Sequence, residues 1–233
     1  MIAMLKSQRN VTPDIAVDVR ADFARREVVL PGGETWRPTP TAGIEHYVLE
    51  RIDAGGARET ALVRYAAGAR GPGGAEEFLV LAGSLHDDTR AYREGAYVRN
   101  PVGLARAAWA GSGGAVLFVK RHQFKVDDPR PVVIDTRTAR WHRGLVPGLS
   151  VLPLHQHGAE HVALVRWAPS TLFKPHQHWG GEEILVLEGV FEDEHGAYPK
   201  GSWLRSPHLS EHHPFTRVDG ALIYVKTGHL GAR

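Results

Sequence analysis

Two histidines and a glutamate stand close together between Phe173 and Glu182. His176 and His178 are two residues apart, and Glu182 follows a Trp-Gly-Gly turn. Because alternate residues of a strand point to the same face, both imidazoles can bind one ion. The turn returns the chain, so Glu182 opens the next strand with its carboxylate towards the same interior. Imidazole and carboxylate ligands together suit Zn, Fe, Mn, Co, Ni or Cu, and a fourth ligand must come from elsewhere.

The segment that holds these residues is one of two copies. Residues 76–120 align with residues 182–226 at an offset of 106, and 16 of the 45 aligned positions are identical. Upstream, residues 61–64 match residues 163–166 at an offset of 102, so the second copy carries about four extra residues just before Glu182. A duplication of this length predicts two similar domains in one chain.

Each copy is predicted to be all-β. Short apolar runs of strand length alternate with glycine-rich segments such as residues 71–74 and 111–114. Many short strands with frequent turn signals are typical of a sandwich or barrel. We expect an N-terminal extension at residues 1–30, a first domain at 31–126, a linker stiffened by two prolines at 127–131 and a second domain at 132–233.

Two motifs of the second copy resemble those of the cupin superfamily. Their residues are His176, His178, Glu182 and Gly189 for the first motif, and Gly201, Pro207 and His212 for the second. The run from Gly180 to Glu194 is similar to the ChrR-type cupin branch in particular. The resemblance covers nearly all of residues 136–230, whereas over residues 30–124 it survives only as the repeat. It implies two tandem cupin barrels, each a double-stranded β-helix or jelly roll.

The resemblance also implies that His212 completes the metal site. Leu209 stands where the family usually has glycine, and losing that glycine could shift the strand by one residue. Such a shift would exchange His212 for its neighbour His213, because adjacent residues of a strand face opposite ways. The spacing from Pro207 favours His212.

The first copy is expected to be a degenerate cupin without a metal site. Arg70, Pro72 and Arg106 occupy the positions aligned with the three histidines, and only Glu76 keeps a ligand type. We therefore expect one divalent transition metal ion per chain, Fe²⁺, Zn²⁺ or Mn²⁺, bound in the C-terminal barrel. The two barrels should pair within the chain as the subunits of a single-cupin dimer do, and a further homodimer stays open.

Three more side chains are candidates for a substrate pocket. Trp179 lies inside the ligand loop, and Phe173 begins it, although a phenylalanine there is more often part of the core. Arg166 could supply a pocket charge, but Arg64 repeats it in the metal-free copy, which favours a structural role. Glu183 is expected to point away from Glu182. We expect solvent exposure for the histidines beside turns or the terminus: His155, His157, His161, His195 and His229.

Composition excludes several classes of protein. The chain has 233 residues, of which 42% are apolar and 23% charged, as in an ordinary globular protein. It has no cysteine, which excludes a disulfide scaffold and a thiol nucleophile. Its net charge of +2 comes from scattered residues, with no basic block for nucleic acid. No stretch approaches the roughly 18 apolar residues of a membrane span. We therefore expect a cytoplasmic protein without nucleic-acid or membrane partners.

The fold leaves the function open. The interpretation we favour is a non-heme, metal-dependent enzyme of the dioxygenase type. Its substrate would be a small oxygenated molecule that chelates the metal, such as a diketone, an α-hydroxyketone or a keto acid. This resembles the acetylacetone-cleaving cupin dioxygenases. The alternatives are a ChrR-like regulatory protein that senses an oxidant or small molecule, and a metal-stabilised structural module. The zinc-binding anti-sigma domain of ChrR is not expected in the roughly 30 residues before the first copy, which lack cysteine.

Overall fold

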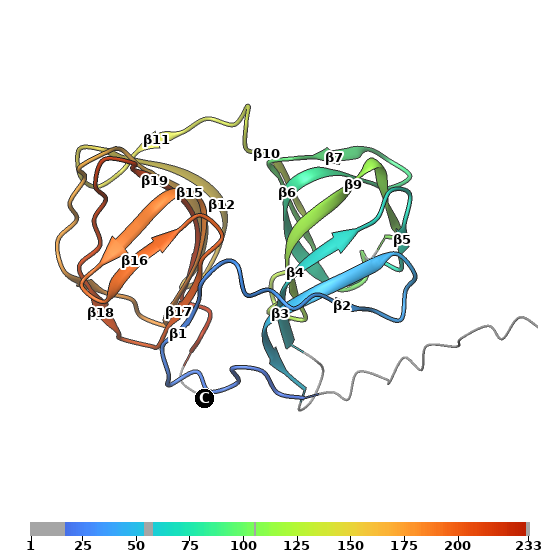
Figure 1. The fold of residues 1–233 in the computed structure, drawn as a ribbon, viewed down its shortest axis with the longest axis horizontal. Helices are drawn as coiled ribbons and strands as arrows, with labels where there is room; N and C mark the ends of the chain where they lie inside the picture. The colour runs from blue at the N-terminus through green and yellow to red at the C-terminus, as the bar shows by residue number, and fades with distance from the viewer. Residues whose placement is uncertain (1–16, 54–57, 105, 232–233) are drawn as a thin grey trace, which may run out of the picture.

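The two repeats form two curled antiparallel sheets that lie side by side (Figure 1). The computed structural model describes residues 17–53, 58–104 and 106–231, and these residues form strands and no helix. The predicted all-β fold of two tandem barrels is therefore confirmed. In the described part of the chain, no helix is long and apolar enough to cross a membrane.

The first barrel contains β2 (Arg37–Pro38), β3 (Ile44–Ile52), β4 (Arg58–Tyr65), β5 (Arg70–Gly71), β6 (Glu76–His86), β7 (Ala91–Arg93), β8 (Ala96–Asn100), β9 (Ala108–Arg121) and β10 (Val132–Asp135). Its sheet runs in the order β10-β8-β6-β9-β4-β3-β2, with β5 paired to β9 and β7 to β6.

The second barrel contains β1 (Glu27–Val29), β11 (His142–Arg143), β12 (Leu149–His157), β13 (Glu160–Trp167), β15 (Glu182–Asp193), β16 (Gly196–Pro199), β17 (Trp203–Ser206) and β19 (Ala221–Thr227). Its sheet runs in the order β1-β17-β15-β19-β13-β12-β11, with β16 paired to β15. A separate two-stranded sheet joins β14 (His176–Gln177) to β18 (Glu211–His212).

The longest strands are buried on both faces. In β6, Phe78 belongs to the core inside the first barrel, while Leu79 packs between the barrels. The equivalent residues of β15, Ile184 and Leu185, divide in the same way. A strand covered on both faces needs apolar side chains at successive positions, which explains why these apolar runs are continuous in the sequence.

The repeats exchange their first strands. β1 pairs with β17 of the second barrel, and its equivalent β10 pairs with β8 of the first barrel. β1 lies in the expected N-terminal extension yet extends the second sheet, and β10 lies in the expected second domain yet extends the first. Sheet membership therefore does not follow the domain boundaries expected at residues 30 and 132.

An apolar core also fills the interface between the barrels. The rings of Phe118 and Tyr224 meet edge to face there with centroids 5.2 Å apart. Tyr97 and Trp203 are fully buried in the same cluster. Both pairs consist of residues 106 positions apart, so equivalent positions of the two repeats build one shared core.

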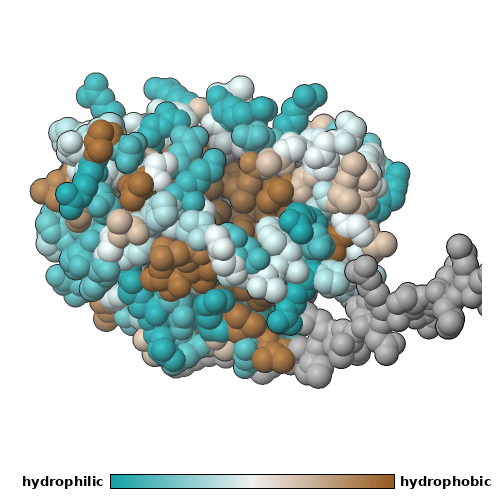
Figure 2. Space-filling model, in the orientation of Figure 1, coloured by the Kyte–Doolittle hydropathy of each residue, from teal (hydrophilic) through white to brown (hydrophobic). Residues whose placement is uncertain are grey.

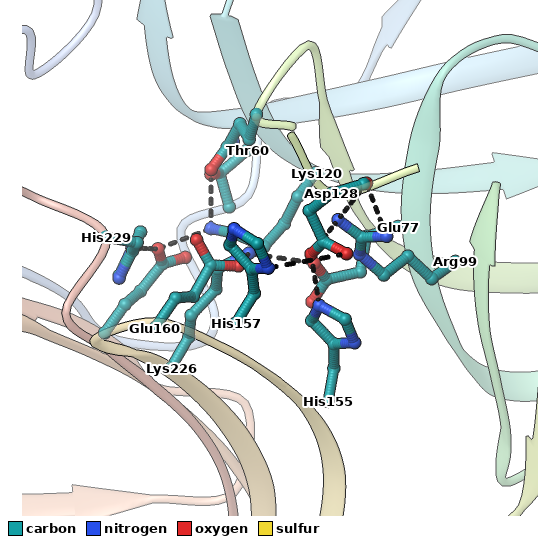
Figure 3. A network of polar contacts seen from close by, with 12 residues as sticks. Thr60, Glu77, Arg99, Lys120, Asp128, His155, His157, Glu160, Lys226 and His229 are labelled. Atoms are coloured by element: carbon teal, nitrogen blue, oxygen red, sulfur yellow. Dashed lines mark hydrogen bonds and ion pairs between the residues drawn. The ribbon is translucent and has the colours of Figure 1, made fainter. Parts of the chain in front are cut away.

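Buried charges cross this interface in both directions (Figure 3). Lys120 of the first barrel donates to Glu183 of the second, and both side chains are almost fully buried. The equivalent Lys226 of the second barrel lies 2.8 Å from Glu77 of the first and 2.9 Å from Glu160 of its own barrel. Glu183 therefore does point away from Glu182 and serves the contact between barrels.

Two histidines expected at the surface are buried. The Nε2 atom of His155 lies 2.6 Å from Asp128, a residue of the expected linker, and that of His229 lies 3.0 Å from Glu183. Their side chains are 2% and 3% exposed, so the expectation of solvent exposure is wrong for both. Their partner carboxylates are distant in sequence, which a local turn pattern cannot reveal. The histidines that are exposed as expected are His161 and His195.

Candidate metal centre

Two short strands hold the three histidines. β14 and β18 pair in antiparallel fashion with His176 directly opposite His212. His178 comes two residues after His176, so its side chain lies on the same face of the chain. The result is a cluster of three imidazoles, in which each ring centroid lies within 5.3 Å of the other two.

A glycine turn delivers the fourth side chain. Gly180 and Gly181 have φ angles of 72° and 71°, in the region that glycine adopts without strain. A Cβ atom on Gly180 would lie 2.7 Å from the Cα atom of Gly228, so this approach also requires a glycine. Directly after the turn, Glu182 opens β15 and is buried at 5% exposure.

Leu209 stands where the family usually has glycine, but it does not shift the register of the strand that contains His212. It adopts a φ angle of 60°, the left-handed conformation that glycine favours, and its N–H donates to the carbonyl of His178 at 3.0 Å. The strand that follows is therefore not shifted, and His212 faces the histidines of the ligand loop. The backbone N–H of His213 instead donates to the carboxylate of Glu194 at 2.8 Å.

The candidate ligand atoms converge closely. The Nε2 atom of His212 lies 3.3 Å from the Nε2 atoms of both His176 and His178. The carboxylate of Glu182 lies 3.2 Å from His178 Nε2 and 3.5 Å from His212 Nε2. Among the described residues, the three histidines are the one group of three or more metal-binding side chains with ligand atoms within 4.8 Å of one another.

Burial sets the protonation of this cluster. Together with the neighbouring imidazoles, it lowers the pKa of His178 to about 3 and that of His212 to about 4. Burial, together with the charge of Asp193, raises the pKa of Glu182 to about 8. Near neutral pH and without a cation, the imidazoles are neutral and the carboxyl group holds its proton. In the described part of the chain, no lysine or arginine forms an ion pair with Glu182.

The donor set fits a divalent transition metal. Nitrogen ligands bind such ions at about 2.1 Å, which places two of them about 3.0 Å apart at a right angle and about 3.4 Å apart at a tetrahedral angle. The observed separations of 3.3 Å fall in that range. The Nδ1 atom of His176 lies 3.0 Å from the carbonyl of Lys174, so an Nδ1–H donor leaves Nε2 free as the ligand atom.

The three expected pocket residues separate in the structure. Phe173 is buried and meets the His176 ring edge to face at 4.8 Å, so it forms a wall of the cluster. Trp179 is 70% exposed and packs against His208, outside the barrel interior. Arg166 does not approach the cluster, and its guanidinium lies 4.4 Å above the ring of Trp141.

The charged residues behind Glu182 were not among the candidates that the sequence indicated. Arg26, in the expected N-terminal extension, lies 3.1 Å from Asp193 and 2.6 Å from the Tyr198 hydroxyl. The charge of Asp193 raises the pKa of Glu182, and that of Arg26 lowers it. Asp193 repeats Asp87 of the first copy, and this identity could have indicated a role for the acid. No pattern in the sequence indicated that Arg26 belongs to the second barrel.

In the first barrel, a guanidinium group lies beside the carboxylate that is equivalent to Glu182. Glu76 lies 3.4 Å from Arg121, which supplies a positive charge beside this carboxylate. Arg70 stacks on Trp109 at 4.9 Å, and Arg106 is exposed. Among the described residues of this barrel, no group of three metal-binding side chains comes together.

Two barrels of this topology, one of them with three histidines and a carboxylate at one point, define a two-domain cupin protein. The sequence model of the family described as "ChrR Cupin-like domain" matches residues 24–125 and residues 129–231, one match for each repeat. The chain therefore belongs to the ChrR cupin-like family. A search of curated proteins gave no significant match.

Solved structures share the fold over most of the chain. A "putative dioxygenase" from Nostoc punctiforme is 16% identical, with a TM-score of 0.65, and the match covers 90% of this chain and 85% of that one. The YlbA protein of E. coli is 16% identical, with a TM-score of 0.68 and coverage of 93% and 96%. Streptomyces albus HEPD, solved with 2-hydroxyethylphosphonate and Fe(II), is 7% identical, with a TM-score of 0.60 and coverage of 90% and 76%.

Proposed function

We propose that the protein is a metal-dependent enzyme of the non-heme dioxygenase type, with its active site at the histidine cluster of the second barrel. The observation that carries this proposal is the convergence of His176, His178 and His212 on Glu182, where no lysine or arginine among the described residues pairs with the carboxyl group. Three imidazoles and one carboxylate leave one or two positions of a divalent ion open to a substrate.

When bound, an ion such as Fe²⁺, Mn²⁺ or Zn²⁺ would polarise a chelating oxygen substrate, and Fe²⁺ would add the chemistry of dioxygen. A diketone, an α-hydroxyketone or a keto acid offers the two oxygen atoms that such chelation needs. The Nostoc punctiforme and HEPD structures, one described as a "putative dioxygenase" and the other containing Fe(II), share this fold and support the proposal by analogy.

The residues of the chain shape the site around that chemistry. Phe173 packs on the ring of His176, and Phe191 lies 6.4 Å from that of His212, so apolar rings exclude water from the inner side of the cluster. The hydrogen bond to the Lys174 carbonyl fixes the orientation of His176. Glu182, protonated near neutral pH in the absence of a cation, is the group that can release a proton when a positive charge binds.

Oxygen uptake tests the proposal directly. The protein is reconstituted with Fe²⁺ without oxygen and then mixed with 2,4-pentanedione, acetoin or pyruvate in an oxygen electrode. We expect substrate-dependent uptake with one of these classes, and a loss of at least a hundredfold in His178→Ala. Glu76→Gln is the matched control, because it changes the equivalent carboxyl group of the metal-free barrel. Full metal occupancy without uptake for any class would overturn the enzymatic role and favour a binding or sensing role.

A further inference from the structure

A cleft of about 290 Å³ opens between the two barrels, and no residue of the metal cluster lines it. Figure 2 shows hydrophobic side chains recessed between the barrels. Equivalent leucines of the two repeats form the floor: Leu62 with Leu164, and Leu81 with Leu187. Several of these side chains are only partly buried, so the packing of the barrels leaves them uncovered. Apolar clefts at domain interfaces, lined by a few polar groups, are typical ligand sites.

The guanidinium group of Arg166 lies at the edge of this apolar floor and is held in one orientation. Arg166 and Trp141 both line the cleft, and the guanidinium lies 4.4 Å above the indole ring. Stacking on the ring orients a guanidinium without using its N–H donors. Within the described residues, no carboxylate lies within 4.0 Å of Arg166. Its donors are therefore directed to no acid among the residues that the structure describes.

The equivalent arginine of the first repeat does have a carboxylate partner, so the two repeats differ at this position. Its equivalent, Arg64, stacks in the same way on Trp36, at 4.6 Å, and donates to Glu45 at 2.6 Å. Glu45 is the cross-strand neighbour of Arg64, whereas the cross-strand neighbour of Arg166 is Ser150. The second repeat thus keeps the stacked arginine but not the acid that neutralises it, and only Arg166 of the two lines the cleft.

The remaining charges of the cleft are not placed like Arg166. Arg137 is paired with Asp135 at 2.9 Å. Lys200 adds a further positive charge to the lining, and Glu94 and Glu188 add two negative ones. These three side chains are exposed, as Arg166 is. Because Arg166 is held on the ring of Trp141, its guanidinium is the charge of the lining that we expect to select the head of a ligand.

We propose that the cleft binds a small amphipathic carboxylate, with its hydrocarbon part on the leucine floor and its carboxylate paired with Arg166. A charge-assisted, two-point contact with the guanidinium would give the specificity, and burial of the chain would give most of the affinity. The site is independent of the metal centre and of the activity proposed for it.

Octanoate is the probe, compared with 1-octanol and octylamine on metal-free protein kept in chelator. Binding is followed by intrinsic fluorescence, because Trp141 lies under the arginine, and by calorimetry. We expect octanoate to bind at least about tenfold more tightly than either uncharged or cationic analogue, since one charge-assisted contact is worth that much. Arg166→Gln should remove the preference, and the matched variant Arg64→Gln should keep it. Trp141→Phe should abolish the fluorescence change.

Several results would overturn the proposal. Equal affinity for octanoate and octanol, or a preference that survives Arg166→Gln, would show that the arginine does not select the ligand. Tighter binding of octylamine would assign the cleft to Glu94 or Glu188. No binding of any probe in the millimolar range would exclude an amphipathic ligand of this size. Ultracentrifugation that showed a dimer dissociated by Arg166→Gln would identify the cleft as an interface between two copies of the chain.

Discussion

His176 and His212 face each other across the pairing of β14 with β18, with their Nε2 atoms 3.3 Å apart. The relationship depends on Leu209, because a shift of one residue in the chain that follows it would bring His213 to this place. Leu209 prevents the shift by adopting a φ angle of 60° and donating to the carbonyl of His178. The price is backbone strain of about 1–2 kcal/mol for a non-glycine residue.

Replacing each of the two adjacent histidines tests this register. His212→Ala should empty the site at micromolar metal, because it removes one of the four proposed ligands. His213→Ala should leave the site occupied, with at most the 10- to 100-fold loss of affinity that is typical for residues outside the ligand set. Metal titration under identical conditions measures both. If His213→Ala loses the metal and His212→Ala retains it, the register is wrong by one residue.

The two lysines that cross the barrel interface should respond differently to loss of an acid. Lys120 forms an ion pair with Glu183 alone among the described carboxylates, whereas Lys226 has both Glu77 and Glu160. Glu183→Gln leaves a buried ammonium without its counter-charge, which typically costs about 3–5 kcal/mol of unfolding free energy. Glu160→Gln should cost less, because Lys226 keeps Glu77.

Urea unfolding in chelator measures the two free energies without a contribution from metal. Lys120→Met is the companion variant for Glu183→Gln. Removing both partners should recover a large part of the loss, because no buried charge remains unpaired. Equal costs for Glu183→Gln and Glu160→Gln, or no recovery in the double variant, would contradict this account of the interface.

Stability should fall as the pH is lowered from about 6.5. Burial lowers the pKa of His229 to about 3, so the unfolded chain takes up this proton first, and stability is lost as the pH falls below about 6.5. Burial opposes ionisation of Glu77, but Lys226 and Tyr224 lower its pKa to about 2. Its contribution is present above about 4.5 and is lost as the pH falls towards 2.

Unfolding free energies at pH 7, 6, 5 and 4, measured in chelator, check this direction. His229→Gln should flatten the profile between pH 6.5 and 4.5, and Glu77→Gln should flatten it below 4.5. The charged and titratable groups that face the two residues are Lys120, Lys226, Glu183, Tyr97 and Tyr224. A profile that is flat from pH 7 to 4 in the unmodified protein would contradict the assignment.

The N-terminal segment should stabilise the second barrel, although it also pairs with the first barrel through Val19 and Arg51. Deleting residues 1–30 removes β1 and leaves the edge of β17 unpaired, and Arg205 loses the carbonyl groups of Arg20 and Asp22. We expect a lower melting temperature and aggregation through the exposed edge. Deleting residues 1–16 removes none of these contacts and serves as the control. Equal melting temperatures for the two truncated proteins would show that the strand exchange contributes no stability.

The sequence predicted those features of the fold and of the candidate site that depend on a local pattern of residues. The repeat predicted two similar domains, and short apolar runs between glycine-rich segments, such as the run that includes Phe78 and Leu79, predicted strands. The spacing of His176, His178 and Glu182 indicated a shared point because strand alternation and a glycine turn are local rules. These parts of the fold and of the candidate site follow from neighbouring residues.

The sequence did not predict the contacts that form between distant segments of the chain. His155 and His229 stand beside turns, which favours exposure, but Asp128 and Glu183 cover them from elsewhere in the chain. Arg26 reaches the second barrel because the repeats exchange their first strands, and a duplicated sequence fits exchanged and unexchanged barrels equally well. Only the three-dimensional packing separates these cases.

The metal content of the protein tests the central claim most directly. The full chain is purified without chelator or nickel resin, and bound metal is counted per chain by elemental analysis, together with Glu182→Ala and Glu76→Ala. The account predicts about one ion per chain in the unmodified protein and in Glu76→Ala, and a large loss in Glu182→Ala. About two ions per chain, or a loss in Glu76→Ala but not in Glu182→Ala, would contradict a single centre in the second barrel.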